Sequence, residues 1–262
     1  MTARPSNILD RLAQMLEQAG GELPLEEAAV EFLRASRPEL ARKVLANLVR
    51  EDVRFHLRGG VLALHPTAGL ADQTPLRQIA FAVLDFETNG LPPGDRAIEV
   101  GVACFLGGTE IATFETLIDS GMPISPFVIR LTGIRPEDLQ GKPPFEDIWP
   151  GLAPLLEKRV LVAHNLPFDR RILRYEVSRL GHSQPVGTDA LCTLKLARRL
   201  LPKGEPKSLD ALAERFGLEF AARHRALDDA RMAGRILQRL LDLAAERVPM
   251  ETMGDLRAFL KG

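Results

Sequence analysis

The 262-residue sequence predicts an α/β protein in which a small helical module precedes a larger domain built around a sheet. Residues 79–86 form a near-continuous apolar run, which is typical of a central strand buried on both faces. Strand-like segments then alternate with amphipathic helical segments as far as residue 245. The first 65 residues have a different pattern, with three helical segments followed by two short strands.

The charge balance and the cysteine content exclude several classes of protein. Lys and Arg number 34 against 35 Asp and Glu, which gives a net charge of −1. A polybasic protein that binds nucleic acid through overall charge is therefore excluded, although a local site can still use metal cations. Two cysteines, Cys104 and Cys192, are too few for a disulfide framework and fit a reducing compartment. Because there is no signal-like or membrane-spanning apolar run, we expect a cytoplasmic location.

Residues 1–65 are expected to form a separate module. Gly20-Gly21 ends the first helix, a second helix covers 25–33, and a third follows Ser36. The apolar stripe of the third helix is expected to consist of Leu40, Val44, Leu48 and Val49. An alternating strand over 53–58, a Gly59-Gly60 turn and a return strand over 61–64 predict a hairpin.

Three helices followed by a hairpin resemble a winged helix-turn-helix. This resemblance implies duplex DNA binding by the third helix and the wing, with contacts from Arg42, Lys43, Arg50, Arg54 and Arg58. The alternative is that these side chains form a solvated face and that the module docks a protein partner or a second copy of itself. Nine basic and nine acidic residues in this stretch leave both possibilities open.

A Pro- and Gly-containing linker is expected over residues 66–77, followed by the main domain over 78–247 and a short C-terminal segment over 248–262. The predicted strands of the main domain are 79–86, 97–106, 111–118 and 159–163. Its last four predicted helices are 168–180, 191–201, 208–216 and 226–245. Three strands joined by tight turns, then strands alternating with helices, is the order of a ribonuclease H-like fold.

Two carboxylates end the first of these strands. Asp85 and Glu87 are two residues apart, so in a strand both side chains point to the same face. Neighbouring carboxylates repel one another and are costly to bury without a partner. A divalent cation with a preference for oxygen ligands, Mg2+ or Mn2+, is the natural partner.

Further acidic residues lie near later elements. Asp169 follows the fourth strand, and by itself it would be read as an acid in the first turn of a helix. His224 and Asp229 are five residues apart, which within one helix would separate them by about 140°. They can share one site only if His224 lies in the loop before the helix and Asp229 lies in its first turns.

Together, three motifs resemble those of the DEDD 3′–5′ exonucleases of the histidine subclass. These motifs are Asp85-Phe86-Glu87-Thr88-Asn89-Gly90, His164-Asn165-x-x-Phe168-Asp169, and His224 with Asp229. The resemblance is strongest to proofreading exonucleases of bacterial replicative polymerases and extends from about Phe81 to Leu241. One departure is Asn89, where the family often has Thr.

The resemblance implies that Asp85, Glu87, Asp169 and Asp229 hold two divalent cations, Mg2+ or Mn2+, and that His224 is the general base. It also implies substrate contacts from Thr88, Leu91, Asn165 and Phe168. Arginines beside the second and third motifs are either guides for the strand or solvent-facing charges: Arg170, Arg171, Arg174, Arg223 and Arg225.

We therefore predict a metal-dependent exonuclease that acts on single-stranded or frayed 3′ ends of DNA, in proofreading or repair. The first alternative is an exoribonuclease that trims RNA ends with the same five residues, since discrimination depends on the fit around the 2′-hydroxyl. The second alternative is a non-catalytic protein that binds DNA or a partner, such as a polymerase or repair protein, through residues 1–65. Intact clustered acids count against this second alternative.

Overall fold

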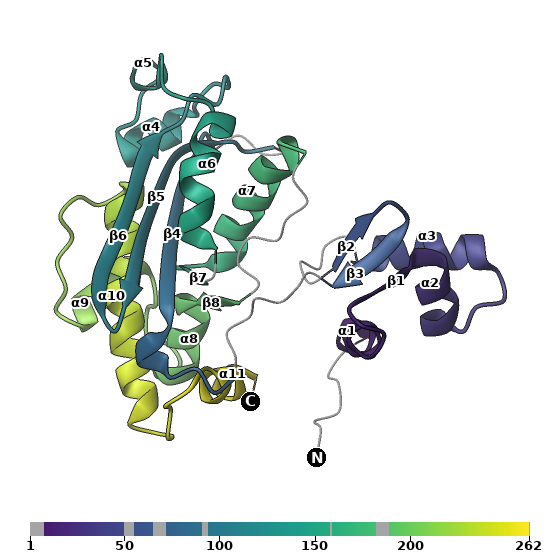
Figure 1. The fold of residues 1–262 in the computed structure, drawn as a ribbon. Coiled ribbons are helices and arrows are strands. Elements are labelled where there is room, and N and C mark those ends of the chain that lie inside the picture. Colours follow the sequence, from purple (N-terminus) through teal and green to yellow (C-terminus); the bar gives the residue numbers. More distant parts are fainter. Residues whose placement is uncertain are drawn as a thin grey trace. The chain divides into compact units, whose positions relative to one another are not determined.

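The computed structural model describes residues 8–49, 55–64, 72–90, 94–157, 159–181 and 189–261. The chain divides into two compact units (Figure 1). Of the described residues, those up to residue 64 belong to the first unit and those from residue 72 onward belong to the second. None of the described helices has both the length and the apolar character needed to cross a membrane.

The N-terminal unit contains the three helices and the hairpin that the sequence predicts. The helices are α1 (Ile8–Gln18), α2 (Leu25–Leu33) and α3 (Pro38–Val49), and the hairpin strands are β2 (Phe55–Arg58) and β3 (Val61–Leu64). A further strand, β1 (Glu22–Pro24), pairs antiparallel with β3 and was not predicted. With only three residues, β1 is too short to show an alternating pattern.

The prediction for the buried face of α3 was partly wrong. Leu40 and Val44 are 57% and 46% exposed, whereas Ala41, Leu45 and Val49 are buried in the core of this unit. The buried residues also recur every four positions, but the stripe begins at the small Ala41. The predicted stripe did not include Ala41 or Leu45, so the helix is rotated relative to the expected orientation.

The second unit is built on a five-stranded sheet with the strand order β6-β5-β4-β7-β8. Three strands, β4 (Ala80–Thr88), β5 (Ala97–Leu106) and β6 (Thr109–Leu117), form an antiparallel meander. The remaining strands, β7 (Val160–Ala163) and β8 (Ala190–Cys192), are added in parallel to the other side of β4. The sheet is therefore mixed, and β4 lies at its centre.

Helices cover both faces of this sheet (Figure 1). Val83 of β4 belongs to the same buried cluster as Ile236 and Leu240 of α10 (Ala226–Ala245). Cys104 of β5 instead lies near α6 (Phe145–Leu156), where its Sγ is 3.7 Å from the Leu155 carbonyl oxygen. Burial on both sides explains the continuous apolar run of β4.

The other helices of this unit are α4 (Pro126–Thr132), α5 (Pro136–Leu139), α7 (Leu166–Arg179), α8 (Thr193–Leu200), α9 (Leu209–Arg215) and α11 (Met253–Lys261), with a short 3-10 helix over Leu76–Gln78. The helix predicted from Leu191 begins only at Thr193, because Ala190–Cys192 form β8 instead. A strand of only three residues directly before a helix is too short to show the two-residue alternation that distinguishes a strand from a helix in the sequence.

The segment at residues 72–77, assigned to the linker by the sequence, is held against the C-terminal segment. The Leu76 amide donates to the Glu251 carbonyl at 2.8 Å, and the Met253 amide donates to the Thr74 carbonyl at 2.9 Å. Arg257 of α11 pairs with Asp189 at 2.7 Å and also with Asp72. The C-terminal residues, for which no element was predicted, thus form a docked helix.

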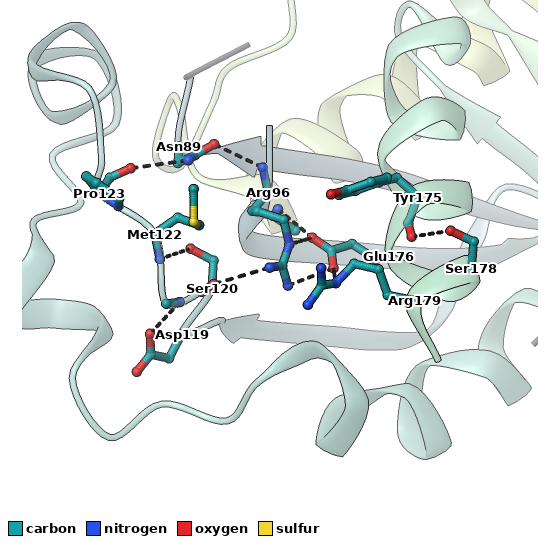
Figure 2. A network of polar contacts seen from close by, with 12 residues as sticks. Asn89, Arg96, Asp119, Ser120, Met122, Pro123, Tyr175, Glu176, Ser178 and Arg179 are labelled. Carbon is teal, nitrogen blue, oxygen red and sulfur yellow. Dashed lines mark hydrogen bonds and ion pairs between the residues drawn. The ribbon is translucent and has the colours of Figure 1, made fainter. Parts of the chain in front are cut away.

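A buried polar network joins the start of β5, the helix α7 and the loop before α4 (Figure 2). The Glu176 carboxylate accepts hydrogen bonds from Arg96 Nε at 2.8 Å and from the Ala97 amide at 3.0 Å. The fully buried Asn89 accepts from the Arg96 amide at 2.9 Å and donates to the Pro123 carbonyl at 3.2 Å. Asn89, at which the sequence departs from the family, therefore has a partner for both its side-chain oxygen and its side-chain nitrogen. These bonds connect the end of β4 to two neighbouring segments.

Candidate active site

The two strand carboxylates lie on the face of the sheet that α10 covers. Across the β4–β5 pair, Asp85 is opposite Gly101 and Glu87 is opposite Glu99. Residues directly opposite in an antiparallel pair share a face. A Cβ atom at Gly101 would lie 2.1 Å from the Leu227 nitrogen of α10, so only glycine permits this close approach.

Parallel pairing brings the second motif to the same place. Because β4 and β7 run in parallel, their carboxyl ends meet at one edge of the sheet. After β7 the chain turns sharply at Asn165, which has a left-handed φ of 73° and precedes α7. Asparagine tolerates this conformation better than most residues. The turn leads directly into the helix that carries Asp169.

Asp169 lies in the first turn of α7 and is 2% exposed. Its Oδ1 accepts a hydrogen bond of 3.2 Å from the Phe86 amide, which lies between Asp85 and Glu87 in β4. This bond fixes the third carboxylate against the strand that carries the first two. From its position alone, Asp169 could have been only an acid that stabilises the N-terminus of a helix. The hydrogen bond to the Phe86 amide shows that it also contacts the strand of Asp85 and Glu87.

His224 and Asp229 of the third motif lie where the sequence analysis required them to be if they share one site. Helix α10 begins at Ala226, so His224 lies in the preceding loop and Asp229 lies in the first turns. His224 adopts a left-handed φ of 62°, which is strained for a residue with a side chain. Glu87, His224 and Asp229 each place a potential ligand atom within 4.8 Å of the others.

The charges of the other three carboxylates affect the ionisation of Asp85. Burial raises the pKa of Asp85 well above its usual value, and the charges of Asp169, Glu87 and Asp229 raise it further. Burial raises the pKa of Glu87 to about 8, with Asp229 and Glu99 as the main additional charges. The pKa values of Asp169 and Asp229 are likewise raised by burial, to about 8 and about 6. Clustered acids with raised pKa values are typical of functional sites.

Divalent cations fit this donor set. The cluster offers only carboxylate oxygens and one imidazole, which suit hard cations such as Mg2+ and Mn2+. Asp229 Oδ1 is buried and accepts no hydrogen bond from any described residue. A buried carboxylate oxygen without a donor is costly, and a bound cation would relieve that cost. Glu87, His224 and Asp229 are the described residues whose ligand atoms lie close enough together to share an ion, and Asp85 and Asp169 stay predicted ligands.

Arg223 contacts residues of the candidate site, a role that the sequence analysis did not predict for it. Its guanidinium pairs with Asp229 and with Asp210 and lies 3.2 Å from His224 Nδ1. The sequence suggested only that Arg223 guides a strand or faces solvent. Asp210, 13 residues before Arg223, was not predicted as a partner of the site. Nothing in local spacing links these two residues, because α9 and α10 are brought together only by the fold.

The other predicted strand guides have structural partners. Arg225 pairs with Glu99 at 2.7 Å, and Arg171 pairs with Asp95 at 3.0 Å while lying 5.3 Å from the centre of the Phe168 ring. Arg170 and Arg174 also have interaction partners. These arginines are therefore not simply free solvent-facing charges.

The predicted substrate contacts stay predictions. Thr88 is 7% exposed and lies at a register shift of the β4–β5 pair, and Phe168 is half-buried in the first turn of α7. Asn165 is exposed and makes no side-chain cap to α7. Leu91 lies outside the described residues.

The predicted DNA contacts of the N-terminal unit are only partly described. Arg42 and Lys43 are exposed on α3. Arg50 and Arg54 lie outside the described residues, and Arg58 is placed only as part of β2. Binding of duplex DNA by this unit therefore stays a prediction.

Comparison with known proteins identifies relatives of the second unit. Residues 82–237 match the family model described as "Exonuclease". DNA polymerase III PolC-type of Thermotoga maritima is 37% identical over 178 residues, which is 66% of this chain and 13% of that protein. The 3′-5′ exonuclease DinG of Bacillus subtilis is 31% identical over 179 residues, or 68% of this chain and 19% of that protein. The chain therefore spans less than a fifth of each of these two curated relatives.

A solved structure supports the same assignment. Exonuclease X in complex with 5′ overhanging duplex DNA has a TM-score of 0.52 and 28% sequence identity. The similarity covers 63% of this chain and 93% of that structure.

Proposed function

The chain belongs to the exonuclease family, and from that premise we propose that it removes nucleotides from the 3′ end of DNA with two divalent cations, Mg2+ or Mn2+. The observation that carries this proposal is the convergence of His224 and four carboxylates, two buried and two half-buried, from β4, α7 and the start of α10. A scaffold protein has no use for such a costly cluster. The names of two relatives, a replicative polymerase and a 3′-5′ exonuclease, agree with this reaction.

Each side chain has a defined part in the proposed reaction. Asp85, Glu87, Asp169 and Asp229 hold the cations, which supply charge neutralisation at the scissile phosphate when bound. His224 accepts a proton from the attacking water, because its lowered pKa keeps the imidazole neutral near pH 7. The water oxygen forms a bond to phosphorus as the bond from phosphorus to the 3′-oxygen of the preceding nucleotide breaks. The products are a nucleoside 5′-monophosphate and a strand one nucleotide shorter.

The substrate is proposed to be a single-stranded or frayed 3′ end of DNA, in proofreading or repair. Thr88, Leu91, Asn165 and Phe168 are the proposed contacts to the terminal nucleotide. The N-terminal unit would bind duplex DNA, a polymerase or a repair protein and so deliver the second unit to such ends. The exposed basic side chains of Arg42 and Lys43 are consistent with DNA, while the exposed Leu40 and Val44 are consistent with a protein partner.

The decisive experiment compares matched 5′-labelled and 3′-labelled single-stranded DNA and RNA oligomers in Mn2+, Mg2+ or EDTA. A metal-dependent ladder from the 3′ end of DNA, lost in Asp85→Ala, would support the proposal. A ladder on RNA alone would move the protein to the exoribonuclease branch. No cleavage of either, by folded protein that still binds duplex DNA, would leave the N-terminal unit as the functional part.

A further inference from the structure

Glu99 is a fully buried carboxylate that the reaction does not use. It lies on β5 opposite Glu87, and its Oε1 accepts hydrogen bonds from Arg225 Nε at 2.9 Å and Arg225 Nη2 at 2.7 Å. Its Oε2 accepts from the Ala226 amide at 3.1 Å. Both carboxylate oxygens are therefore engaged by two consecutive residues at the start of α10.

This contact acts where the catalytic helix begins. Arg225 is the N-cap of α10 and Ala226 is its first residue, so Glu99 satisfies one of the amides that a helix leaves unpaired at its N-terminus. Helix N-termini also favour a negative charge. Two residues away, Gly101 lies against Ala226 and Leu227 so closely that a Cβ atom would overlap the helix backbone. Glu99 and Gly101, on the same face of β5, thus fix both the position and the angle of the helix start.

His224 and Asp229, the proposed base and a proposed metal ligand, lie on either side of this contact in the sequence. His224 precedes Arg225 directly and has a strained left-handed φ of 62°, which persists only if the surrounding structure enforces it. Asp229 is three residues beyond Ala226, and its amide donates to the Arg225 carbonyl at 2.9 Å. Holding Arg225 and Ala226 therefore holds the proposed base and a proposed metal ligand together.

We propose that Glu99 is a positioning residue: by clamping Arg225 and the Ala226 amide, it holds His224 and Asp229 in their reactive arrangement. The proposal rests on the exonuclease function proposed above. The Glu99 carboxylate bonds to Arg225 and to the Ala226 amide, so its proposed effect on the reaction passes through the start of α10, beside the influence of its charge on the pKa of Glu87. Since a displacement of about 1 Å at a catalytic group can cost roughly 100-fold in rate, the clamp is a determinant of turnover.

The chain contains a matched control for this clamp. Glu176 accepts from Arg96 Nε at 2.8 Å, from Arg96 Nη2 at 3.1 Å and from the amide of the following Ala97 at 3.0 Å (Figure 2). Both clamps therefore use a buried Glu, an Arg and the amide of the Ala that follows the Arg. They differ in what they hold, since the second one joins the start of β5 to α7 rather than the start of α10.

The test compares Glu99→Gln with Glu176→Gln in the full chain. Each variant replaces one carboxylate oxygen with an NH2 group, which cannot accept hydrogen bonds from the arginine and the main-chain amide. Both variants should therefore have a lower melting temperature than the wild type. Glu99→Gln should also lower kcat on single-stranded DNA by about 10- to 100-fold while KM stays within about threefold. Glu176→Gln should keep kcat within about threefold. Equal losses of kcat in the two variants, or wild-type kcat in Glu99→Gln, would reduce Glu99 to a structural role.

Hydrogen exchange of the metal-free protein provides a readout that is independent of activity. The peptide covering 222–231 should exchange faster in Glu99→Gln than in the wild type, and at the wild-type rate in Glu176→Gln. Unchanged exchange in Glu99→Gln would overturn the clamp. If the wild type has no nuclease activity, this comparison still decides the clamp, and only the proposed function fails.

Arg225→Lys covers the case in which Glu99→Gln does not fold. The Arg225 side chain is 41% exposed, and lysine keeps the positive charge beside Glu99 but loses the two-pronged contact. We expect this variant to fold, to lose about three- to tenfold in kcat, and to exchange faster over the same peptide. Wild-type turnover and exchange in Arg225→Lys would contradict the proposal.

Discussion

Asp169 accepts a hydrogen bond from the main-chain amide of Phe86, a residue 83 positions earlier that lies between Asp85 and Glu87. The bond joins the first turn of α7 to the end of β4 and brings three acids together. Because the charges of Glu87 and Asp169 raise the pKa of Asp85, the ionisation of these acids is linked, and in the proposed site it is also linked to metal binding. The following predictions use that linkage and the groups around it.

The stability of the metal-free protein should fall as the pH rises from about 6 to 8.5. The pKa values of Glu87 and Asp169 are raised to about 8 and that of Asp229 to about 6, whereas unfolded carboxyls titrate near ~4. A raised pKa stabilises the folded state at low pH, and that contribution is lost as the pH rises through the folded value. Thermal denaturation in EDTA across this range measures the effect.

Two comparisons test the cause of that pH dependence. Mg2+ or Mn2+ should restore the melting temperature most strongly at the alkaline end, because ionised carboxylates bind the cation and protonated ones do not. Asp169→Asn should have a shallower decline in EDTA than the wild type, since one of the titrating groups is gone. A melting temperature that is equally independent of pH in both proteins would contradict the shared site.

His224→Ala should lower kcat by about 10²- to 10⁴-fold, the usual contribution of a general base. Its affinity for Mn2+ should change little, because the four carboxylates are retained. In the wild type, kcat should rise with pH, and the midpoint of this rise should lie below that of a free imidazole, since burial and the charge of Arg223 lower the pKa of His224. Titration calorimetry together with pH–rate profiles would make these measurements.

A parallel loss of Mn2+ affinity and turnover in His224→Ala would give this residue a different role. His224 has a potential ligand atom within 4.8 Å of those of Glu87 and Asp229, so such a result would make it a metal ligand. His164→Ala is a useful control. The His164 ring nitrogen Nδ1 pairs with Thr193 Oγ1 at 2.9 Å, and burial lowers the pKa of His164 to about 4, so it stays neutral throughout the assay.

Arg223→Gln should bind Mn2+ a few-fold more tightly than the wild type. The Arg223 guanidinium is the cationic partner of Asp229, so an incoming metal ion has to displace it. For the same reason the metal-free variant should have a lower melting temperature, because Asp229 loses its counter-charge. Calorimetry and thermal denaturation in EDTA measure both effects.

Arg215→Gln is the matched control for Arg223→Gln. Arg215 pairs with Glu205 on the surface, and both side chains are about 40% exposed. Such a pair contributes little, so its loss should change neither metal affinity nor melting temperature appreciably. Weaker Mn2+ binding in Arg223→Gln would show instead that the arginine organises the ligands.

Removing residues 1–68 should leave the nuclease reaction and weaken binding to duplex DNA. The second unit has its own core, built from β4, β7, α8, α9 and α10, which supports independent folding. The doubly substituted full chain, Arg42→Gln with Lys43→Gln, should bind duplex DNA more weakly and with a smaller dependence on salt. Fluorescence anisotropy at several salt concentrations measures both variants.

An unchanged duplex affinity in both proteins would favour a protein-docking role for the N-terminal unit. In that case Leu40→Ser with Val44→Ser becomes the informative variant. These two side chains are exposed on α3 and contribute little to the core of their unit. Substituting them should then abolish partner binding without unfolding the module.

Local patterns were sufficient to predict most of the elements. The apolar run that became β4 and the helix α10 over Ala226–Ala245 were both expected, and α10 has the predicted bounds. Short or small-residue segments were not predicted correctly: β8 was taken for part of a helix, and Ala41 was overlooked on α3. A strand of three residues is too short to show the two-residue period of a strand or the 3.6-residue period of a helix. Alanine is small and contributes little to an apolar stripe.

The sequence by itself determined which residue types form the candidate site, because Asp85, Glu87, Asp169, His224 and Asp229 lie in motifs with characteristic order and spacing. Only the tertiary structure decided that Arg223 pairs with Asp229 and Asp210, and that Glu99 and Gly101 hold the start of α10. The physical reason is that strand pairing and helix packing bring together residues far apart in the sequence, such as Glu99 and Ala226, which are 127 positions apart. No local period encodes such contacts, whereas a motif is written within a few consecutive residues.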